Sequence, residues 1–461
     1  MTIEEFRGHG HKIVDWISRY LETIRERRVL PQVRPGEIID ALPPQAPEQG
    51  EPFERIFADF ENKILTASTA WNHPRFFSYF AISSTPPSIL AEMVMAALNQ
   101  NGLLWKSGPA LTELEQVTLG WLRQWLGLPE NFFGIIYDTA STSTLHALIA
   151  ARQAVAPESR AKGSPQGLVV YTSEQAHSSV LKDALALGFG ESQVRLIASD
   201  SEFRMRLDEL ERHLIADTSN GLIPCCVVPT IGATPAASVD PVKEVIALGR
   251  RFGAWVHVDA AYAGPVAILP ERREFFEGWE EADSLVVNPH KWLLTNFDLS
   301  VFFTARPDIL RDAIGTTPEY LRTTQDPRML NYMDYSIPLG RRFRALKLWF
   351  AMRAYGREGA ANLIRGHLAD GQWLKQQVEA DSRFEIAAPV HFSLVCFRLK
   401  SSDAANHQLM NTINDSGFAF LSHTVLGGQV ALRFAIGNWQ TTREDVAATW
   451  AKIQEIASTL T

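Results

Sequence analysis

The sequence has few cysteines, no long apolar run and no excess of positive charge. Only Cys225, Cys226 and Cys396 are present among 461 residues, and two of them are adjacent. Neighbours in a strand point to opposite faces, so this pattern favours buried apolar side chains over a disulfide framework or a metal site. No apolar stretch reaches the ~18 residues that cross a bilayer, and the acidic first residues do not resemble a signal peptide. We therefore expect a cytoplasmic protein.

The charge balance excludes broad electrostatic partners. The formal net charge is −8 at pH 7, which gives no general attraction to nucleic acid or to an anionic membrane. One dense basic cluster, Arg341-Arg342-Phe343-Arg344 with Lys347, is short, and we interpret it as the start of a helix. His9-Gly10-His11 would need further ligands to bind a metal, and we expect an exposed or subunit-contacting turn there.

The first part of the chain is predicted to be helical. Residues 3–27 carry apolar side chains at helical spacing with charges between them, which predicts an amphipathic helix that covers its own domain or a partner subunit. The proline-rich stretch 42–52 indicates an extended connector, and residues 53–70 indicate a second helical segment.

The middle of the chain alternates short apolar runs with helical stretches. This alternation is typical of a largely parallel sheet covered by helices on both faces. The expected strands are Phe133–Tyr137, Gly167–Tyr171, Val194–Ala198, Cys225–Pro229, Ala254–Val258, Ser284–Val287 and Val301–Thr304.

Beyond residue 340 the pattern changes to that of a smaller α+β domain. Helical residues 340–380 lead into Phe392–Leu399 and Val430–Ile436, which read as strands alternating with helices. We expect a helical segment over residues 1–81, a large α/β domain over 82–348 and a small α+β domain over 349–461.

Polar clusters follow four of the expected strands, where ligands bind in open α/β sheets. Asp138-Thr139-Ala140-Ser141-Thr142-Ser143-Thr144 leads into a helix, and its small hydroxyl residues suit either a helix cap or a phosphate site. His177, in Gln175-Ala176-His177-Ser178-Ser179, is either a capping residue or a ring that faces a ligand.

The other two clusters supply an acid and a lysine. Asp259, in His257-Val258-Asp259-Ala260-Ala261-Tyr262, ends an apolar strand, and a buried carboxylate there implies a cationic partner such as a pyridinium nitrogen. Lys291, in Asn288-Pro289-His290-Lys291-Trp292, has apolar neighbours of the kind that lower an ammonium pKa enough for covalent attachment to an aldehyde. Together the four clusters meet the needs of a phosphorylated pyridine aldehyde cofactor.

In these motifs the chain resembles the group II pyridoxal-phosphate decarboxylases, specifically the aromatic-L-amino-acid decarboxylases. Besides the four clusters, the matching segments are His73-Pro74-Arg75-Phe76-Phe77-Ser78-Tyr79-Phe80, Ile337-Pro338-Leu339-Gly340-Arg341-Arg342-Phe343-Arg344 and Leu432-Arg433-Phe434-Ala435-Ile436. They cover nearly the whole chain. The resemblance implies the fold type I architecture of aminotransferases, pyridoxal 5'-phosphate as cofactor, and a homodimer with the active site at the subunit interface.

The resemblance also implies a role for each site residue. Lys291 would bind the cofactor covalently, Asp259 would pair with its ring nitrogen, and His177 would stack on the ring and orient the substrate carboxylate. Tyr320, in a predicted lid loop over about 320–336, would help to return a proton to the α-carbon, and the presence of His177 and Tyr320 favours simple decarboxylation over aldehyde formation. The remaining cofactor-binding residues would be Ala140, Ser141, Thr234, Asn288 and His290.

The expected substrate is an aromatic L-amino acid (tryptophan, phenylalanine, tyrosine or dopa), which the enzyme would convert to the amine and CO2. The residues near its side chain would be Trp71, Tyr79, Phe80, Ile82, Leu103 and Gly340. Ile82 lacks the hydroxyl that a catechol would bind, and Gly340 leaves room that favours indoles. Asp138 departs from the glycine that usually begins the phosphate site in this family.

Two alternatives remain open at this point. The same fold also supports transamination or the decarboxylation of a non-aromatic amino acid. A sensor that binds the cofactor without turnover is a third possibility, although the first ~80 residues show no basic recognition helix.

Overall fold

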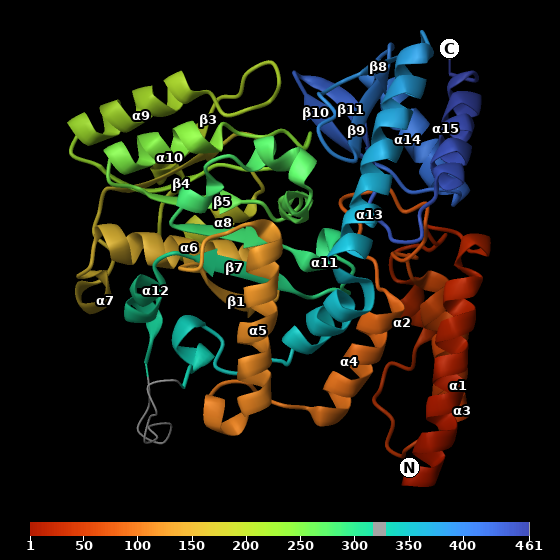
Figure 1. Ribbon diagram of the computed structural model, residues 1–461. Coiled ribbons are helices and arrows are strands. Elements are labelled where there is room, and N and C mark those ends of the chain that lie inside the picture. The colour runs from red at the N-terminus through yellow and green to blue at the C-terminus, as the bar shows by residue number, and fades with distance from the viewer. Residues whose placement is uncertain (317–328, 461) are drawn as a thin grey trace. The chain divides into compact units, whose positions relative to one another are not determined.

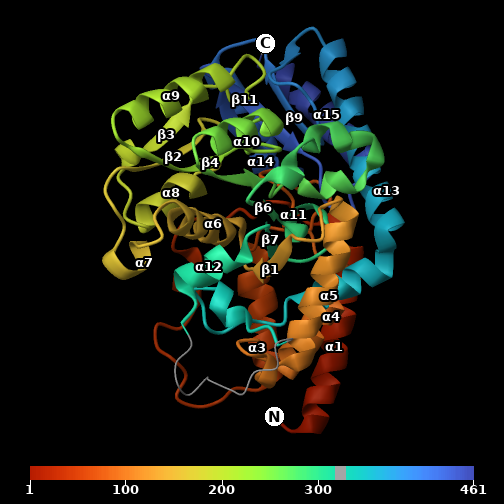
Figure 2. The same cartoon turned by 60° about the vertical axis from the view of Figure 1, so that its left-hand side comes forward.

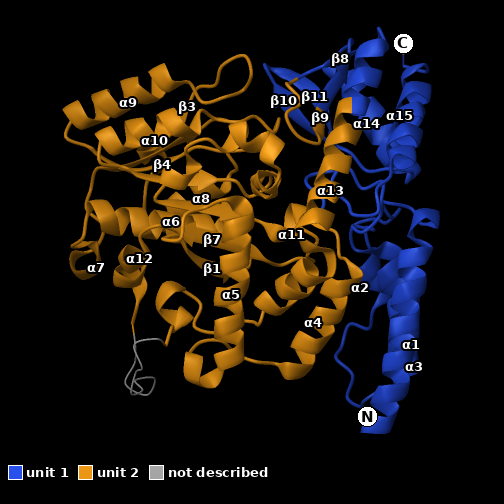
Figure 3. Ribbon diagram, viewed as in Figure 1, with its two compact units in different colours: residues 1–81, 373–387, 396–461 blue, residues 82–372, 388–395 orange. Residues whose placement is uncertain are grey.

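The computed structural model describes residues 1–316 and 329–460. The chain forms two compact units, which Figure 3 shows in different colours. Unit 1 comprises residues 1–81, 373–387 and 396–461, and unit 2 comprises residues 82–372 and 388–395. The division into domains at residues 81 and 348 stays a prediction.

Unit 2 is built on a seven-stranded sheet with the order β1-β7-β6-β5-β4-β2-β3. The five strands from β6 to β3 are parallel, whereas β7 runs antiparallel to both β6 and β1. The strands are β1 Phe133–Tyr137, β2 Leu168–Ser173, β3 Val194–Ile197, β4 Ile223–Val228, β5 Trp255–Asp259, β6 Ser284–Val287 and β7 Ser300–Thr304. All seven expected strands are therefore confirmed, with ends that differ by up to two residues.

Helices cover both faces of this sheet, as Figures 1 and 2 show. Alternate residues of one strand enter opposite cores: Val170 packs with α6 and α8, whereas Val169 and Tyr171 pack with α9 and α10. The helices of unit 2 are α4 Pro86–Leu98, α5 Pro109–Leu126, α6 Ala140–Val155, α7 Ser159–Lys162, α8 Ser179–Ala186, α9 Leu207–Ser219, α10 Val242–Arg251, α11 Pro289–Trp292 and α12 Pro307–Ile314. Burial on both faces explains why these strands are continuously apolar in sequence.

Unit 1 combines the amino-terminal helices with a four-stranded sheet of order β10-β11-β9-β8. Its helices are α1 Ile3–Glu22, α2 Glu37–Ala41, α3 Phe53–Asp59, α14 Asp403–Ser416 and α15 Arg443–Ala457. Its strands are β8 Phe384–Ile386, β9 Leu394–Leu399, β10 Ser422–Leu426 and β11 Gln429–Ala435. The long helix α13, Ala345–Ala380, breaks at Gly356, where φ is +63°, a conformation that glycine adopts without steric cost.

Helix α1 and the cysteines bear on two local predictions. His9-Gly10-His11 was expected in a turn, but these residues lie inside α1, where His9 stacks against Phe53 with ring centroids 4.3 Å apart, so the turn prediction was wrong. The three cysteines are buried and free of disulfides, as the sequence predicted. Within the described residues, no helix is both long and apolar enough to span a bilayer.

Candidate active site

The carboxyl end of β5 places Asp259 among backbone groups from two neighbouring strands. Its side chain is only 7% exposed, and its carboxylate accepts the N–H of Ala261 at 3.0 Å. The carbonyl of Asp259 accepts the N–H of Ile231 after β4, at 2.8 Å. The N–H of Asn288 after β6 donates to Ala261 at 3.1 Å. The loops after β4, β5 and β6 therefore meet at Asp259.

Lys291 lies on the short helix α11 directly after β6. Its N–H donates to the Asn288 carbonyl at 2.9 Å, and its side chain is half-buried. The next residue, Trp292, stacks on Tyr262 with ring centroids 5.0 Å apart and an angle of 2° between the planes. This stacking joins the two motifs that contain Lys291 and Asp259.

His290 and Asn288 present polar groups at the same place. The Leu299 N–H donates to Nδ1 of His290 at 2.9 Å, so the ring proton lies on Nε2, where it can donate to a ligand. Burial, reinforced by the charges of Lys291 and Lys347, lowers the pKa of His290 to about 3. The Oδ1 of Asn288 is buried and finds no hydrogen-bond partner among the described residues.

His177 follows β2, and the charges of Asp259 and Lys291 both act on its imidazole ring. The Ser179 N–H donates to His177 Nδ1 at 3.1 Å, which leaves Nε2–H as the available donor. Burial lowers the pKa of His177, the Asp259 charge opposes this shift, and the Lys291 charge adds to it. The structure thus brings together the three side chains that the sequence singled out.

Helix α6 begins at Ala140 after β1. Thr139 caps the helix by accepting the Thr142 N–H, and the N–H groups of Ala140 and Ser141 lie in the first turn, where a helix has no internal partners for them. Asp138 lies beside this turn, where its Oδ1 accepts the N–H of Thr139 at 2.7 Å. The first-turn N–H groups suit an anion, and the Asp138 carboxylate is their neighbour.

Thr234 lies in a loop that is anchored next to Asp259. Gly232 (φ +85°) brings this loop close to the segment after β5, and a Cβ at this position would lie 2.7 Å from the Cβ of Ala263. Asp240 closes the loop by accepting the N–H of Thr230 at 2.8 Å. Thr234 itself is half-buried.

The predicted substrate residues fall into two groups. Ile82, Leu103 and Gly340 belong to unit 2, where a Cβ added at Gly340 would only touch the Asn101 side chain at 3.5 Å. Trp71, Tyr79 and Phe80 belong to unit 1. Trp71 and Tyr79 stack with centroids 5.9 Å apart, and both are partly exposed. Tyr320 and residues 317–328 lie outside the described residues.

Several buried polar residues received no role from the sequence. His257 lies two residues before Asp259, on the same face of β5, and burial lowers the pKa of His257 to about 4. His146 on α6 accepts the Ile337 N–H at Nε2 and is also buried. A histidine on an apolar strand or helix was the only available signal, and it does not distinguish core from ligand.

The basic cluster is structural, as predicted. Arg341 pairs with the buried Glu115 at 2.6 Å, Arg342 pairs with Glu92 at 2.6 Å, and Arg344 makes two hydrogen bonds of 3.0 Å to Asp298. The complete burial of Lys347, the last residue of this cluster, was not predicted from the sequence.

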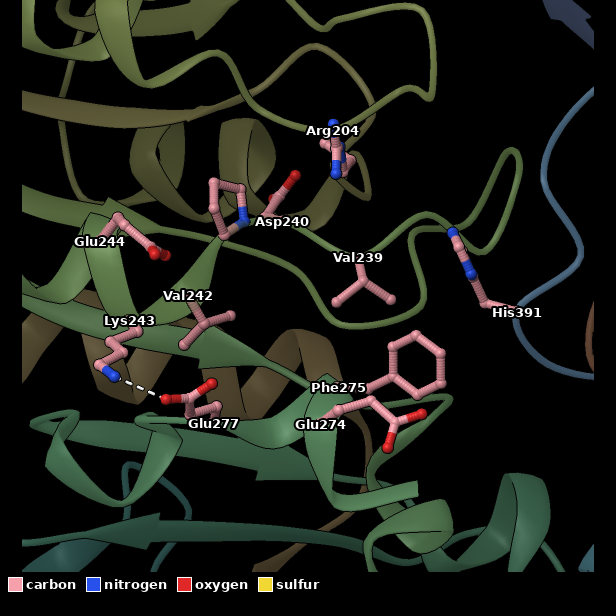
Figure 4. Close-up of a pocket in the computed structure, with 11 residues that line it drawn as sticks. Arg204, Val239, Asp240, Val242, Lys243, Glu244, Glu274, Phe275, Glu277 and His391 are labelled. Atoms are coloured by element: carbon pink, nitrogen blue, oxygen red, sulfur yellow. Dashed lines mark hydrogen bonds and ion pairs between the residues drawn. The ribbon is translucent and has the colours of Figure 1, made fainter. Parts of the chain in front are cut away.

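A separate pocket of about 220 Å³ lies elsewhere in unit 2. Figure 4 shows Arg204, His391 and Phe275 around it and the Lys243–Glu277 ion pair at its edge. None of the predicted cofactor residues is among the described residues that line it. Asp240 forms part of the wall of this pocket and also holds the loop beside Asp259.

The residue set fits pyridoxal 5'-phosphate. A helix start suits the phosphate, the buried Asn288 amide has an unsatisfied atom, Asp259 offers a carboxylate for a ring nitrogen, and Lys291 offers an amine. No group of histidine, cysteine and acidic side chains in residues 1–316 and 329–460 is arranged to hold a metal ion.

Comparison with known proteins identifies the family of the chain. Residues 35–400 match the family model described as the pyridoxal-dependent decarboxylase conserved domain. The chain is 42% identical to the aromatic-L-amino-acid decarboxylase of Bos taurus, across 100% of this chain and 97% of that protein. It is 40% identical to the phenylacetaldehyde synthase of Arabidopsis thaliana, with the same coverage.

The structural comparison gives the same family. The structure of Oryza sativa TDC with PLP and tryptamine has a TM-score of 0.97 and 34% identity, and the match covers 100% of this chain and 99% of that one. The predicted fold type I architecture is confirmed. The chain belongs to the pyridoxal-dependent decarboxylase family and is a carboxy-lyase that uses pyridoxal 5'-phosphate.

Proposed function

We propose that this enzyme converts an aromatic L-amino acid to its amine and CO2 with the residues assembled around Asp259. The observation that supports the proposal is that Lys291, Asp259 and His177 lie at the carboxyl ends of parallel strands of one sheet, where the charges of Lys291 and Asp259 act on His177. The similarity to the bovine aromatic-L-amino-acid decarboxylase and to the rice protein with tryptamine supports an aromatic substrate.

In this proposal polar groups from several segments hold the cofactor. Lys291 would hold it through its aldehyde, and the first-turn N–H groups of Ala140 and Ser141 would bind its phosphate together with Asn288 and the Nε2–H of His290. Thr234 would bind near the ring hydroxyl. The cofactor then supplies an electron-accepting ring, which stabilises the charge left on the α-carbon when CO2 departs.

The protein side chains direct which bond breaks. Asp259 holds a negative charge against the protonated ring nitrogen in a buried place, where its electrostatic effect is stronger than in water. The Nε2–H of His177 donates to the substrate carboxylate and turns it towards the leaving position. Tyr320 returns a proton to the α-carbon.

The aromatic side chain is bound by apolar residues. In unit 2, Ile82 and Leu103 would add aliphatic surface and Gly340 would leave space for an indole. Trp71, Tyr79 and Phe80, which the sequence resemblance assigns to the substrate, belong to unit 1, where Trp71 stacks on Tyr79. Since Ile82 offers no hydrogen bond to a catechol, we rank tryptophan above dopa.

A panel assay tests the proposed reaction. Tryptophan, phenylalanine, tyrosine, dopa and glutamate are incubated separately with the holoenzyme, and CO2, amine and keto acid are measured. We expect equal amounts of CO2 and amine from aromatic substrates and none from glutamate. Keto acid as the main product would mean transamination, and cofactor absorbance without any product would mean a sensor.

Aldehyde formation is a second candidate, because a phenylacetaldehyde synthase is 40% identical to this chain. We predict that the wild type releases amine, and that Tyr320→Phe keeps the cofactor but slows amine formation about 100-fold or diverts it to aldehyde, since a general acid typically contributes 10²–10⁴-fold. Quantifying amine, aldehyde and hydrogen peroxide for both proteins checks this. Unchanged rates and products would remove Tyr320 from the mechanism.

We further propose a homodimer in the cytoplasm, with the active site at the subunit interface. Large apolar side chains are exposed on two helices: Ile3 (77%) and Phe6 (63%) on α1, and Leu90 (52%) and Leu98 (51%) on α4. Exposed apolar surface of this kind is typical of an interaction site. Sedimentation of the holoenzyme gives the oligomeric state, and a monomer at micromolar concentration would refute the dimer.

A further inference from the structure

Lys347 on α13 is a fully buried lysine. Its side chain is 0% exposed, and no other lysine among the described residues falls in the buried class. Its Nζ lies 3.2 Å from Oε2 of Glu92 but makes no well-directed hydrogen bond within the described part of the chain. Burying an ammonium costs several kcal/mol unless charges or hydrogen bonds compensate it. A single ion pair leaves spare donor capacity and calls for a further partner.

The charges around Lys347 do not cancel. Glu92 also accepts from Arg342 at 2.6 Å and from the Asn296 amide at 3.3 Å. Beside them Arg344 pairs with Asp298 at 3.0 Å. Three cations thus face two carboxylates, which leaves one positive charge. Because Lys347 lies away from solvent, salt screens its charge less than the charge of an exposed residue.

This cluster lies directly behind His290. The loop after α11 carries Asn296 and Asp298, which contact the cluster, and then Leu299, whose N–H holds Nδ1 of His290. Lys347 is therefore linked to His290 through Glu92, Asn296 and the backbone of the loop from Asn296 to Leu299. The lowering of the His290 pKa by the charge on Lys347 is a second sign that the two groups are close.

We propose that Lys347 is a positioning residue for the phosphate group of the cofactor, supplying a buried positive charge that favours a dianion beside His290. The inference rests on the proposed placement of the phosphate at His290 and Asn288. It assigns to Lys347 no contact with the reacting atoms. Its effect should therefore depend on the phosphate and not on the pyridine ring.

The test compares two ligands that differ only in that group. Pyridoxal 5'-phosphate and pyridoxal are titrated into the full-length apoenzyme, and binding is followed by tryptophan fluorescence and by the visible absorbance of the bound aldehyde. For Lys347→Met we expect about tenfold weaker binding of the phosphorylated form and less than about twofold change for pyridoxal, as removal of one nearby charge predicts. Lys347→Arg should restore the phosphate preference. Equal weakening of both ligands, or of neither, would overturn the proposal.

A second variant keeps the test decisive if Lys347→Met does not fold. Glu92→Gln removes a negative charge from the cluster, so binding of pyridoxal 5'-phosphate should tighten about threefold while binding of pyridoxal stays the same. Weaker binding of the phosphorylated form, or a parallel change in both ligands, would refute a charge effect.

The control is Arg353→Met on the same helix. Arg353 is exposed and lies over Trp349 at 4.8 Å, so its removal should leave both affinities unchanged. A wild-type chain that binds neither ligand would refute the proposed cofactor site itself. If Lys347→Met weakened the binding of both ligands equally while the wild type bound them, the role of Lys347 would be refuted and the proposed cofactor site would still stand.

Discussion

The carboxyl edge of the large sheet buries polar side chains, whereas the amino-terminal helix α1 exposes apolar ones. At the sheet edge His290, Asn288 and Asp259 are buried, and the Oδ1 of Asn288 has no hydrogen-bond partner among the described residues. In α1 no residue is buried, and Ile3 and Phe6 are exposed. Buried polar groups without partners indicate a ligand, whereas exposed apolar groups indicate another protein surface. Changes at the sheet edge should therefore alter chemistry, and changes in α1 should alter assembly.

The largest expected effect is at the sheet edge. Lys291→Ala should remove the visible absorbance of the bound cofactor and lower turnover by at least about 10³-fold, because alanine has no amine to attach the aldehyde. Turnover with the preferred aromatic substrate and the absorbance spectrum check this. Lys162→Ala, at an exposed lysine paired with Glu158, is the matched control and should change neither. Undiminished turnover in Lys291→Ala would refute the assignment of the anchor.

In α1 the expected effect is on assembly. Phe6→Glu places a charge in the proposed subunit contact and should weaken the dimer about 100-fold, since burying an apolar ring and excluding a charge are each worth a few kcal/mol. Sedimentation over a range of concentrations measures this. Arg7→Ala, at a neighbouring exposed residue, should have little effect. If Phe6→Glu instead abolished cofactor binding in a protein that stays dimeric, the contrast between the two regions would fail.

The two regions should also differ in their response to acid. His146, His257 and His290 have pKa values of about 4, 4 and 3 because they are buried, whereas an unfolded histidine titrates near 6.5. The unfolded chain binds more protons below pH 6.5, so stability is fully present above that pH and falls as pH drops towards 4, by roughly 1.4 kcal/mol per pH unit for each ring.

Thermal midpoints at pH 7.5, 6 and 5 measure this dependence. His257→Gln should flatten it by about one proton, whereas His11→Gln in α1 should leave it unchanged, since His11 is exposed. If the thermal midpoint fell equally steeply with pH in the wild type and in both variants, the buried histidine rings would not be the cause of the acid sensitivity.

The smallest effect concerns substrate choice. Gly340→Ser should be tolerated, because a Cβ there meets only Asn101 at 3.5 Å, and it should shift selectivity from indoles towards phenols by about three- to tenfold, the usual effect of small volume changes in an apolar pocket. The ratio of kcat/KM for tryptophan and tyrosine checks this. An unchanged ratio would place Gly340 away from the substrate ring.

The spacing and position of apolar residues in the sequence predicted much of the fold. The seven strands of unit 2 were found because strands buried on both faces are short and continuously apolar. The antiparallel direction of β7 was not predicted, because strand direction depends on pairing partners and leaves no local pattern. The turn predicted at His9-Gly10-His11 was wrong, because these residues lie inside α1, where His9 contacts Phe53 and Glu54.

The sequence by itself determined the chemistry of the site, since Lys291, Asp259 and His177 each follow an apolar strand, and the carboxyl ends of parallel strands meet at one edge. Tertiary structure alone decided how those groups are held. It brought the loops after β4 and β6 onto the segment that carries Asp259, and it buried Lys347 beside Glu92. Such features depend on contacts between residues far apart in the chain, and no spacing within one segment records them.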